Sequence, residues 1–579
     1  MKIKVARTSG FCYGVRRAVN LAFEEAIHGD NLYTLGELIH NPQVLEILKQ
    51  RGVRIAKKIE DIPESATVII RSHGVTPQAK AALRNRSLKI IDATCPKVAR
   101  VQQLAERAVR LGMHVILFGD SEHSEVKAIA AHAEGRTSIV KDRKELDAVI
   151  STIPTSDKIS FMAQTTQNIA LWKELVTHLL ALRPDAEIYE TICGATDERQ
   201  NEVRRLAREV DALVIVGGFQ SANTQRLVEI SKNEGIPAFQ VETEADLPRK
   251  ELARFETVGV AAGASTPSWM IRRILHSLDV TVAVKPSFLL FLLEFWRFIV
   301  RSNILVAFGA AQLLYAASRL QGIEPELPYQ IIVAAYIFAM HLLNHFTDRF
   351  TTEINYPARV GFYERFRRLL LTLGIVATAS SLVFAYFLGP LAFIIIFAMS
   401  LLGLVYRMEL FKIGRVGPRR LMDIPGSKDL FLGMAWTVII ALLVVPASGS
   451  RFTPATGIAA FFVFSLAFTR SLVYSIRDVQ GDRMVGRETV AVLVGESRTR
   501  RLGAFVLALS ACSMVFSFIL GWTSAVSLFL IVNLVYAFIA LWLTRSESNY
   551  SDVFFETIVE GNLVLSQLAA WFVHLSGLA

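Results

Sequence analysis

The feature of this sequence that most constrains its fold is an abrupt change in hydropathy near residue 285. Before this point the chain is mixed and charged, as in a globular protein. After "AVKPS" come apolar runs such as "LAFIIIFAMSLLGLVY" and "AWTVIIALLVVP", which suit membrane spans of about 20 residues. A chain of 579 residues is also too long for a single core. We therefore predict two domains, residues 1–282 and residues 283–579.

Three cysteines of the first domain recur after a short strand and before a helix. They are Cys12 in "KIKVARTSGFCYGVRRAV", Cys95 in "LKIIDATCPKVARV" and Cys193 in "AEIYETICGATDERQ", at spacings of 83 and 98 residues. Strands that alternate with helices predict parallel sheets with crossover helices. We therefore expect an α/β domain of three units related by a pseudo-threefold axis, a trefoil-like arrangement that brings the three thiols together.

Polar side chains follow other strands of these units at matching offsets. His40, His123 and Ser221 repeat the spacings of 83 and 98 residues. Any one of these groups is more often a helix cap than a ligand, but the repeated offsets favour a shared diphosphate pocket at helix N-termini. The full set of hydrogen-bonding candidates is His40, His73, His123, Thr165, Thr166, Ser221, Asn223 and Ser265.

Glu125 lies two residues after His123. If burial raises its pKa, it would hold a proton at neutral pH and act as a proton donor. The alternative is that Glu125 only stabilises the first turn of a helix.

The cysteines have four open roles: packed small side chains, nucleophiles, ligands of zinc in a hydrolytic site, or ligands of an iron–sulfur cluster. Their repetition favours a metal site over packing. A closed structural zinc site usually has four ligands, but Cys512 lies in the apolar run "LALSACSMVF", where helix packing is the simpler role. Three thiolates leave one metal position open, as a [4Fe–4S] cluster with one exposed iron would. Four cysteines in the whole chain also indicate a reducing compartment.

Nine ordered motifs resemble the hydroxymethylbutenyl diphosphate reductases, the LytB/IspH family: "FCYGVRRAV", "LGELIHNP", "RSHG", "DATCPKV", "EHSEV", "QTT", "ICGATDERQ", "SAN" and "AGAS". The resemblance implies a [4Fe–4S] cluster on Cys12, Cys95 and Cys193, and reduction of the substrate to isopentenyl and dimethylallyl diphosphate in the non-mevalonate route. It implies reduced ferredoxin or flavodoxin as the electron donor. The catalytic residues that it implies are Glu125, Thr165 and His123. It also adds Ala222 to the substrate-binding set, where many relatives have a second serine.

We predict nine membrane spans in the second domain, at about residues 302–320, 328–347, 369–388, 390–406, 429–447, 455–475, 502–520, 523–543 and 556–576. Basic residues crowd the loops after the second, fourth and sixth spans, whereas "LGP" and "PASGS" are short and nearly uncharged. The positive-inside rule then predicts an integral protein of a bacterial cell membrane with its N-terminal domain in the cytoplasm. The same asymmetry explains the net charge of +10, so no nucleic-acid partner is expected.

Two of the basic loops also carry carboxylates. "NHFTD" contains Asn344 and Asp348, and "RDVQGD" contains Asp478 and Asp482. Residues four apart share a helical face, and facing pairs would hold Mg²⁺ ions that bridge a diphosphate. Ordinary charges at a membrane edge are the alternative. Nearby cations favour a functional site; they are Arg359, Lys412, Lys428 and Arg477.

This half resembles the UbiA family of membrane prenyltransferases, through "NHFTDRFTTEINYPAR" and "YSIRDVQGDRMVGRETVAVLVG". The resemblance implies that Mg²⁺ activates a prenyl diphosphate and that the allylic carbocation alkylates an acceptor, commonly an aromatic or lipid molecule. The first motif departs from the family pattern. His345 stands where an aspartate is usual, and Thr352 where another acidic residue is expected, which predicts weaker Mg²⁺ binding or unusual substrates.

The leading hypothesis is a fusion of a cytoplasmic iron–sulfur reductase with a membrane prenyltransferase. Its small-molecule partners are prenyl diphosphates, and its second half contacts membrane lipid. The alternative is that the membrane half is a non-catalytic anchor or binding module.

Overall fold

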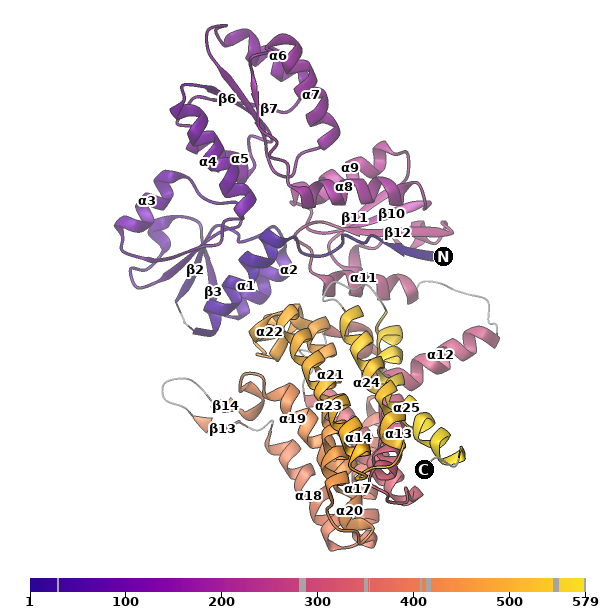
Figure 1. Cartoon of the computed structure of the whole chain (residues 1–579). Helices are drawn as coiled ribbons and strands as arrows, with labels where there is room; N and C mark the ends of the chain where they lie inside the picture. Colours follow the sequence, from indigo (N-terminus) through magenta and orange to yellow (C-terminus); the bar gives the residue numbers. More distant parts are fainter. Residues whose placement is uncertain are drawn as a thin grey trace. The chain divides into compact units, whose positions relative to one another are not determined.

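The protein is described from a computed structural model, whose described residues are 1–28, 31–280, 288–347, 352, 355–406, 409–412, 418–544 and 551–576. The chain forms two compact units, Met1–Ala283 and Val284–Ala579. The first unit alternates strands with helices, and the second is almost entirely helical (Figure 1).

The first unit contains three parallel four-stranded sheets, which confirms the predicted α/β class. The first sheet has, in spatial order, β3 (Val53–Ala56), β2 (Leu32–Leu35), β4 (Thr67–Ile70) and β5 (Lys89–Asp92). The second has β7 (Thr137–Val140), β6 (His114–Phe118), β8 (Ile159–Ala163) and β9 (Glu187–Ile188). The third has β11 (Ala238–Val241), β10 (Ala212–Val216), β12 (Thr257–Ala262) and β1 (Lys2–Val5).

The first strand of the chain completes the last of these sheets. β1 pairs in parallel with β12, with Lys2 opposite Thr257. The outermost fourth strands are therefore β5, β9 and β1, and each is followed by one cysteine: Cys95, Cys193 and Cys12. The three sheets thus share one strand order, whereas the trefoil-like symmetry stays a prediction.

Helices connect the strands of the first unit. Pro42, Pro77 and Pro96 are the first residues of α2 (Pro42–Gln50), α3 (Pro77–Asn85) and α4 (Pro96–Arg110), where the missing N–H leaves no helical hydrogen bond unmade. β8 and β10 are buried along their whole length, as expected of parallel strands covered on both faces. The helices are α1 (Tyr13–His28), α2 (Pro42–Gln50), α3 (Pro77–Asn85), α4 (Pro96–Arg110), α5 (Ser124–His132), α6 (Arg143–Thr152), α7 (Ile169–Leu182), α8 (Gly194–Ala207), α9 (Ala222–Asn233), α10 (Arg249–Leu252) and α11 (Ser268–Val280), with short 3₁₀ turns η1 (Ile59–Asp61) and η2 (Glu244–Asp246).

The second unit is a helical bundle with one short hairpin. Its helices are α12 (Phe288–Arg301), α13 (Ile304–Leu320), α14 (Leu327–Thr347), α16 (Pro357–Arg365), α17 (Arg367–Leu388), α18 (Pro390–Val405), α19 (Ser427–Thr437), α20 (Val444–Ala447), α21 (Pro454–Val485), α22 (Val490–Val494), α23 (Glu496–Ile519), α24 (Val526–Leu543) and α25 (Asp552–Leu575). The remaining elements are the antiparallel strands β13 (Glu409–Lys412) and β14 (Pro418–Arg420), the 3₁₀ turn η3 (Leu421–Asp423) and the π-helical turn η4 (Val438–Leu442).

Among the described residues, seven helical segments are long and apolar enough to cross a membrane. A bent pair, Phe291–Arg301 with Ile304–Leu320, would make an eighth span, and the apolar helix Pro390–Val405 is shorter. The predicted helical class of this unit is therefore confirmed, whereas its count of nine spans is not.

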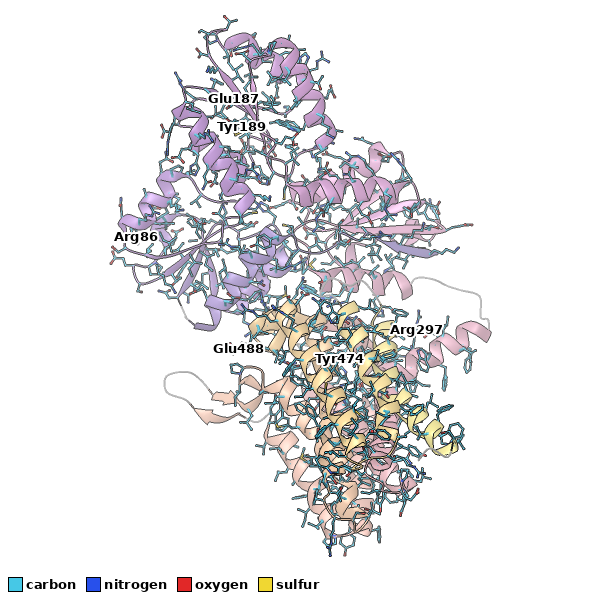
Figure 2. All side chains as sticks on the ribbon, viewed as in Figure 1. Arg86, Glu187, Tyr189, Arg297, Tyr474 and Glu488 are labelled. Atoms are coloured by element: carbon cyan, nitrogen blue, oxygen red, sulfur yellow. The ribbon has the colours of Figure 1, made fainter. Side chains whose placement is uncertain are left out.

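Small residues allow close helix contacts inside the bundle. A Cβ on Gly309 of α13 would lie 2.8 Å from the Leu563 Cβ on α25, so only glycine permits this approach. Large apolar side chains such as Ile375 and Phe387 face outward, as in a lipid-exposed helix. Polar side chains lie inside instead: Figure 2 shows Tyr474 between the helices of the bundle, in contrast to Arg297 on α12.

Candidate active sites

The three cysteines of the first unit lie at helix N-termini and line one cavity of about 90 Å³. Cys95 and Cys193 are the N-cap residues of α4 and α8, and Cys12 directly precedes α1. Their backbone N–H groups donate to the carbonyls of Ser72, Thr165 and Ala264, at 2.9, 3.0 and 3.0 Å respectively. Each cysteine is therefore tied to the loop that follows a neighbouring strand.

Gly14 brings α1 against Cys95. A Cβ at this glycine would overlap the Cys95 Sγ atom, so a larger residue would push the helix away from the thiol. Burial raises the pKa of Cys95, and the nearby Cys12 and Cys193 thiols raise it further. The other two sulfur atoms are thus close enough to disfavour ionisation of the Cys95 thiol, which a bound cation would reverse.

Three histidines form a second wall of the same cavity. The rings of His40 and His73 stack with centroids 4.7 Å apart, and His123 meets them edge-on at 5.7 and 5.4 Å. One nitrogen of each ring lies within 4.8 Å of the others, a spacing that also permits a metal ion. Burial lowers the pKa of His73 well below its usual value, and burial lowers that of His123 to about 4. Both rings are therefore neutral at pH 7.

The hydrogen bonds of the three histidines and their neighbours indicate which N–H groups can donate to a ligand in the cavity. The Nδ1 atom of His123 accepts the Glu125 backbone N–H at 3.2 Å, so the neutral ring carries its proton on Nε2. Among the described residues, the buried His73 Nδ1 and Asn223 Nδ2 atoms have no hydrogen-bond partner. A buried polar atom without a partner is costly. These atoms indicate a polar ligand in the cavity.

The hydroxyl groups predicted to bind substrate line the cavity as well. Ser265 Oγ donates to the His40 carbonyl at 3.1 Å, and Ser221 caps α9 through the Thr224 N–H. Ala222 begins α9 and supplies no polar side chain. The cavity gathers all the residues that were predicted for this site: Cys12, His40, His73, Cys95, His123, Glu125, Thr165, Thr166, Cys193, Ser221, Ala222, Asn223 and Ser265.

Glu125 is buried, with 1% of its surface exposed, and it accepts two hydrogen bonds from Thr165. Its Oε1 atom accepts the Thr165 backbone N–H at 2.7 Å, and its Oε2 atom accepts the Thr165 hydroxyl at 3.1 Å. Burial raises the pKa of Glu125, and these two hydrogen bonds oppose that shift only in part. The pair is thus arranged to hold a proton beside the cavity.

Arg199 is a supporting residue that the sequence reasoning did not assign. Its guanidinium donates to the carbonyls of Thr8 and, at 2.6 Å, Gly10, and so fixes the loop before Cys12. Burial lowers the pKa of Arg199, whereas Cys12 raises it. The quoted motif "ICGATDERQ" contained this residue, but only the fold brings it to Cys12.

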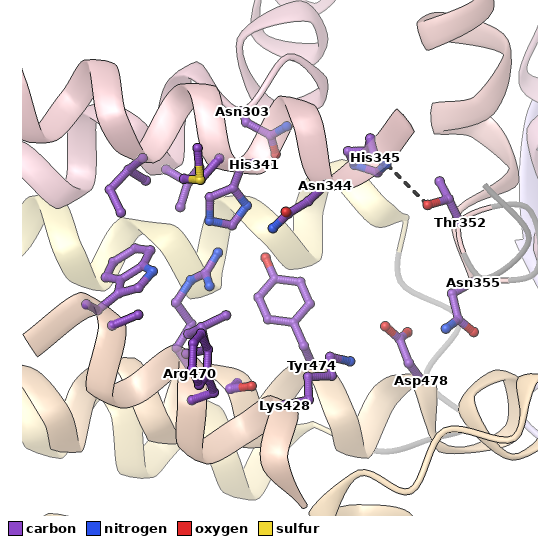
Figure 3. A pocket seen from close by; sticks show the side chains of 18 of the residues that line it. Asn303, His341, Asn344, His345, Thr352, Asn355, Lys428, Arg470, Tyr474 and Asp478 are labelled. Atoms are coloured by element: carbon purple, nitrogen blue, oxygen red, sulfur yellow. Dashed lines mark hydrogen bonds between the residues drawn. The ribbon is translucent and has the colours of Figure 1, made fainter. Parts of the chain in front are cut away.

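The second unit holds a larger cavity, of about 340 Å³ (Figure 3). One face of α21 lines it with residues four apart, namely Arg470, Tyr474, Asp478 and Asp482. Met340, Met399, Phe431 and Leu432 form part of its apolar wall. The cavity therefore combines a polar row along α21 with an apolar wall, as an amphiphilic ligand requires.

The two aspartates predicted on α21 are buried and contacted from other elements. The Tyr356 hydroxyl donates to Asp478 Oδ2 at 2.6 Å, and Asn355 Nδ2 donates to Asp482 Oδ1 at 3.2 Å. Lys428 Nζ lies 3.6 Å from Asp482 Oδ2. Asn344 also lines the cavity, whereas Asp348 lies outside the described residues.

The two unusual positions of the first motif contact each other. His345 Nδ1 and Thr352 Oγ1 are 3.2 Å apart (Figure 3). His345 Nε2 is 3.1 Å from the Arg359 guanidinium. Arg359 also forms an ion pair with Glu556 of α25. Since a guanidinium only donates, His345 Nε2 must accept and the Nδ1 atom carries the proton.

A row of carboxylates on α25 extends this network. Asp552, Glu556 and Glu560, four residues apart, pair with Arg477, Arg359 and Arg470. Glu560 Oε1 also accepts the Tyr474 hydroxyl at 2.7 Å. The sequence analysis did not assign Arg470, Tyr474, Glu556 or Glu560 to this site. Each pair is four residues apart within an apolar helix, and this spacing could have indicated one shared polar face.

The other cations predicted near this site have different positions. Arg359 and Lys428 line the cavity. Arg477 pairs with Asp552 and stacks over Phe555, with its guanidinium carbon 4.2 Å from the ring centroid. Lys412 ends β13.

Comparison with known proteins confirms both predicted resemblances. Residues 3–279 match the LytB protein family, and residues 303–558 match the UbiA prenyltransferase family. The 4-hydroxy-3-methylbut-2-enyl diphosphate reductase of Syntrophotalea carbinolica is 40% identical over 280 residues, 48% of this chain and 99% of that protein.

Two solved structures are also similar to parts of the chain. The (E)-4-hydroxy-3-methyl-but-2-enyl diphosphate reductase that is the terminal enzyme of the non-mevalonate pathway is 37% identical, with a TM-score of 0.38, over 48% of this chain and all of that one. A UbiA homolog from Archaeoglobus fulgidus, bound to DMAPP and Mg²⁺, is 18% identical, with a TM-score of 0.36, over 48% of this chain and 98% of that one. The chain therefore belongs to the LytB family of 4-hydroxy-3-methylbut-2-enyl diphosphate reductases of the non-mevalonate pathway, and it carries a UbiA prenyltransferase family domain over residues 303–558.

Proposed function

We propose that residues 1–282 reduce 4-hydroxy-3-methylbut-2-enyl diphosphate to isopentenyl and dimethylallyl diphosphate in the cytoplasm. We further propose that residues 283–579 transfer a prenyl group from a diphosphate to an aromatic or lipid acceptor. The observation that carries the first proposal is a single cavity lined by three cysteines, three histidines and the Glu125–Thr165 pair.

Cys12, Cys95 and Cys193 are the residues that would hold a [4Fe–4S] cluster. Their thiols fit three irons, and the described residues that line the cavity include no fourth cysteine, so one iron would stay open to substrate. When bound, the cluster would supply electrons and a Lewis acid for breaking the C–O bond.

The diphosphate would be held by hydrogen-bond donors of the histidine wall and by helix N-termini. His123 Nε2–H, His73 and Asn223 Nδ2 are the donors that the geometry leaves for a ligand. α5 and α9 begin at this cavity, and the partial positive charge of a helix N-terminus favours phosphate.

Glu125 would supply a proton through Thr165. When Glu125 is protonated, the direction of its hydrogen bond with the Thr165 hydroxyl reverses: the carboxyl donates to Thr165 Oγ1, and the hydroxyl passes its own proton to the leaving oxygen of the substrate. The overall step takes up two electrons and two protons, breaks one C–O bond and releases water. A reduced ferredoxin or flavodoxin is the class of electron donor that we propose.

In the second unit, Asp478 and Asp482, with Asn344 and Asp348, would hold Mg²⁺, and the donor diphosphate would bind there. When bound, Mg²⁺ would neutralise the diphosphate and make it a better leaving group. Lys428, Arg359 and Arg487 line the cavity beside the aspartates and would stabilise the departing diphosphate. The apolar wall would shield the allylic cation from water.

Purified full-length protein tests both activities. Anaerobic incubation with 4-hydroxy-3-methylbut-2-enyl diphosphate and a reduced ferredoxin is expected to yield both five-carbon diphosphates, together with about four irons per chain. Isotope-labelled prenyl diphosphates, incubated with membrane extract, should label a lipid in wild type and not in Asp482→Asn. Equal labelling by both proteins would refute prenyl transfer at this motif and favour the alternative of a non-catalytic anchor or binding module.

A further inference from the structure

The segment from Asn355 to Arg359 reaches the aspartates of α21 from a different part of the bundle. We propose that Asn355 and Tyr356 are positioning residues that orient Asp482 and Asp478 to bind a divalent cation. This inference rests on the proposed prenyl-transfer site and names residues that set its metal affinity.

Each of the two residues donates one hydrogen bond to one aspartate. The Tyr356 hydroxyl is 2.6 Å from Asp478 Oδ2, and Asn355 Nδ2 is 3.2 Å from Asp482 Oδ1. Asn355, Asp478 and Asp482 are buried, with 1%, 4% and 0% of their surfaces exposed. Buried hydrogen bonds of this kind fix the rotamers of both partners, because water does not compete for them.

Each of these hydrogen bonds reaches only one of the two oxygens of its carboxylate. Tyr356 engages one oxygen of Asp478, and Asn355 engages one oxygen of Asp482. The two hydrogen bonds therefore orient both carboxylates, and Lys428 Nζ lies 3.6 Å from the other oxygen of Asp482, Oδ2. A donor on the second oxygen orients a ligating carboxylate, and loss of such an outer partner typically weakens metal binding by about 10- to 100-fold.

Arg359 anchors the same segment on its other side. It pairs with Glu556 of α25 and contacts His345 Nε2 of α14 at 3.1 Å. His345, at a position where the family has an aspartate, thus contacts Arg359 here, and the Arg359 backbone N–H donates to the Tyr356 carbonyl at 2.9 Å. The contacts of Arg359 therefore support the segment that carries Tyr356.

The test is Mn²⁺ binding to the full-length protein in lipid nanodiscs, followed by the electron paramagnetic resonance signal of free Mn²⁺. Binding at this site is defined as the Mn²⁺ that the Asp482→Asn variant loses, which removes any contribution from the first unit. Inorganic diphosphate is added in a second titration as the anion probe.

Tyr356→Phe removes only a hydroxyl, and we expect it to weaken this Mn²⁺ binding about 10- to 100-fold. Tyr363→Phe is the matched control, since Tyr363 lies on α16 and accepts a hydrogen bond from Asn303 at 2.7 Å. We expect it to bind Mn²⁺ as wild type does. Asn355→Leu tests the second hydrogen bond and should also weaken binding.

The outcomes separate this inference from the proposed function. Wild-type affinity in both Tyr356→Phe and Asn355→Leu would overturn the positioning role while leaving the metal site intact. Equal weakening by Tyr356→Phe and Tyr363→Phe would also overturn it. Absence of any Asp482-dependent Mn²⁺ in wild type would instead refute the proposed metal site, and this inference with it.

Discussion

Some of the polar residues of the two candidate sites lie at opposite ends of helices. In the first unit, His123 and Ser221 cap the N-termini of α5 and α9. In the second unit, His345 and Asp482 lie in the last turns of α14 and α21. A helix N-terminus carries partial positive charge and attracts anions, whereas a C-terminus carries partial negative charge and attracts cations.

This difference explains why two sites proposed to bind diphosphates look unlike each other. The pocket of the first unit meets the anion directly, with neutral imidazoles, amides and helix N-termini. The cavity of the second unit presents carboxylates and needs a cation between protein and diphosphate. Sheets bring helix N-termini together at their carboxyl edge, whereas a membrane bundle offers mainly side chains along its helices.

The largest expected effect is the loss of iron and of reductase activity from the first unit in Cys95→Ser, with no change in the second unit. Replacing Cys95 by serine should abolish reductase activity and lower the iron content, because a cluster with two thiolates is not held. Mn²⁺ binding by the second unit should be unchanged. Cys512→Ser is the control, since Cys512 is exposed on α23. Full reductase activity in Cys95→Ser would refute the three-thiolate site.

Removal of divalent cations should act on the second unit alone. With EDTA present, prenyl transfer is expected to fall to background, because the aspartates then repel the donor diphosphate. Binding of isopentenyl diphosphate to the first unit, measured by isothermal titration calorimetry in the Asp482→Asn variant, should stay the same. If EDTA weakened binding of isopentenyl diphosphate to the first unit, the two sites would not differ in their need for a divalent cation, and the three histidines would be the candidate ligands of that cation.

Glu125→Gln tests whether Glu125 is the proton donor of the first unit. Glutamine fills the same space and one of its atoms still accepts from Thr165, but it holds no transferable proton. We expect the reductase turnover to fall about 10²- to 10⁴-fold. The affinity for isopentenyl diphosphate should change little, and a loss of affinity as large as the loss of turnover would contradict the proton-donor role.

Acid should destabilise the first unit through His123, whose pKa falls from 6.5 to about 4 on folding. Between these values the unfolded chain binds more protons, so this contribution is complete above pH 6.5 and is lost as the pH falls toward 4. The loss is about 3 kcal/mol. Native-state hydrogen exchange of β6 amides in the intact chain measures it.

His123→Asn is the control for this pH dependence. It removes the histidine contribution, and the difference from wild type separates His123 from Glu125, whose raised pKa acts in the opposite direction. Identical pH dependence of the two proteins would contradict the assignment to His123.

Much of the first unit could be predicted from the sequence because its repeated units place similar residues at matching spacings. Cys12, Cys95 and Cys193 share one spacing pattern with His40 and His123, and all five line the same cavity. The helical second unit and its two aspartates followed from apolar runs and from carboxylates four residues apart. Arg199 and Tyr356 were not assigned, since their partners lie far away in the chain, at Gly10 and Asp478.

The sequence by itself determined the two units, their secondary structure classes and the cysteines, because period, hydropathy and spacing are local properties of a chain. Only the tertiary structure decided that β1 completes the sheet of β10, β11 and β12, and so carries Cys12 to the other thiols. Only the tertiary structure also decided which residues brace the aspartates of α21. Strand pairing and buried hydrogen bonds join residues distant in sequence, and a one-dimensional pattern does not specify which partners meet.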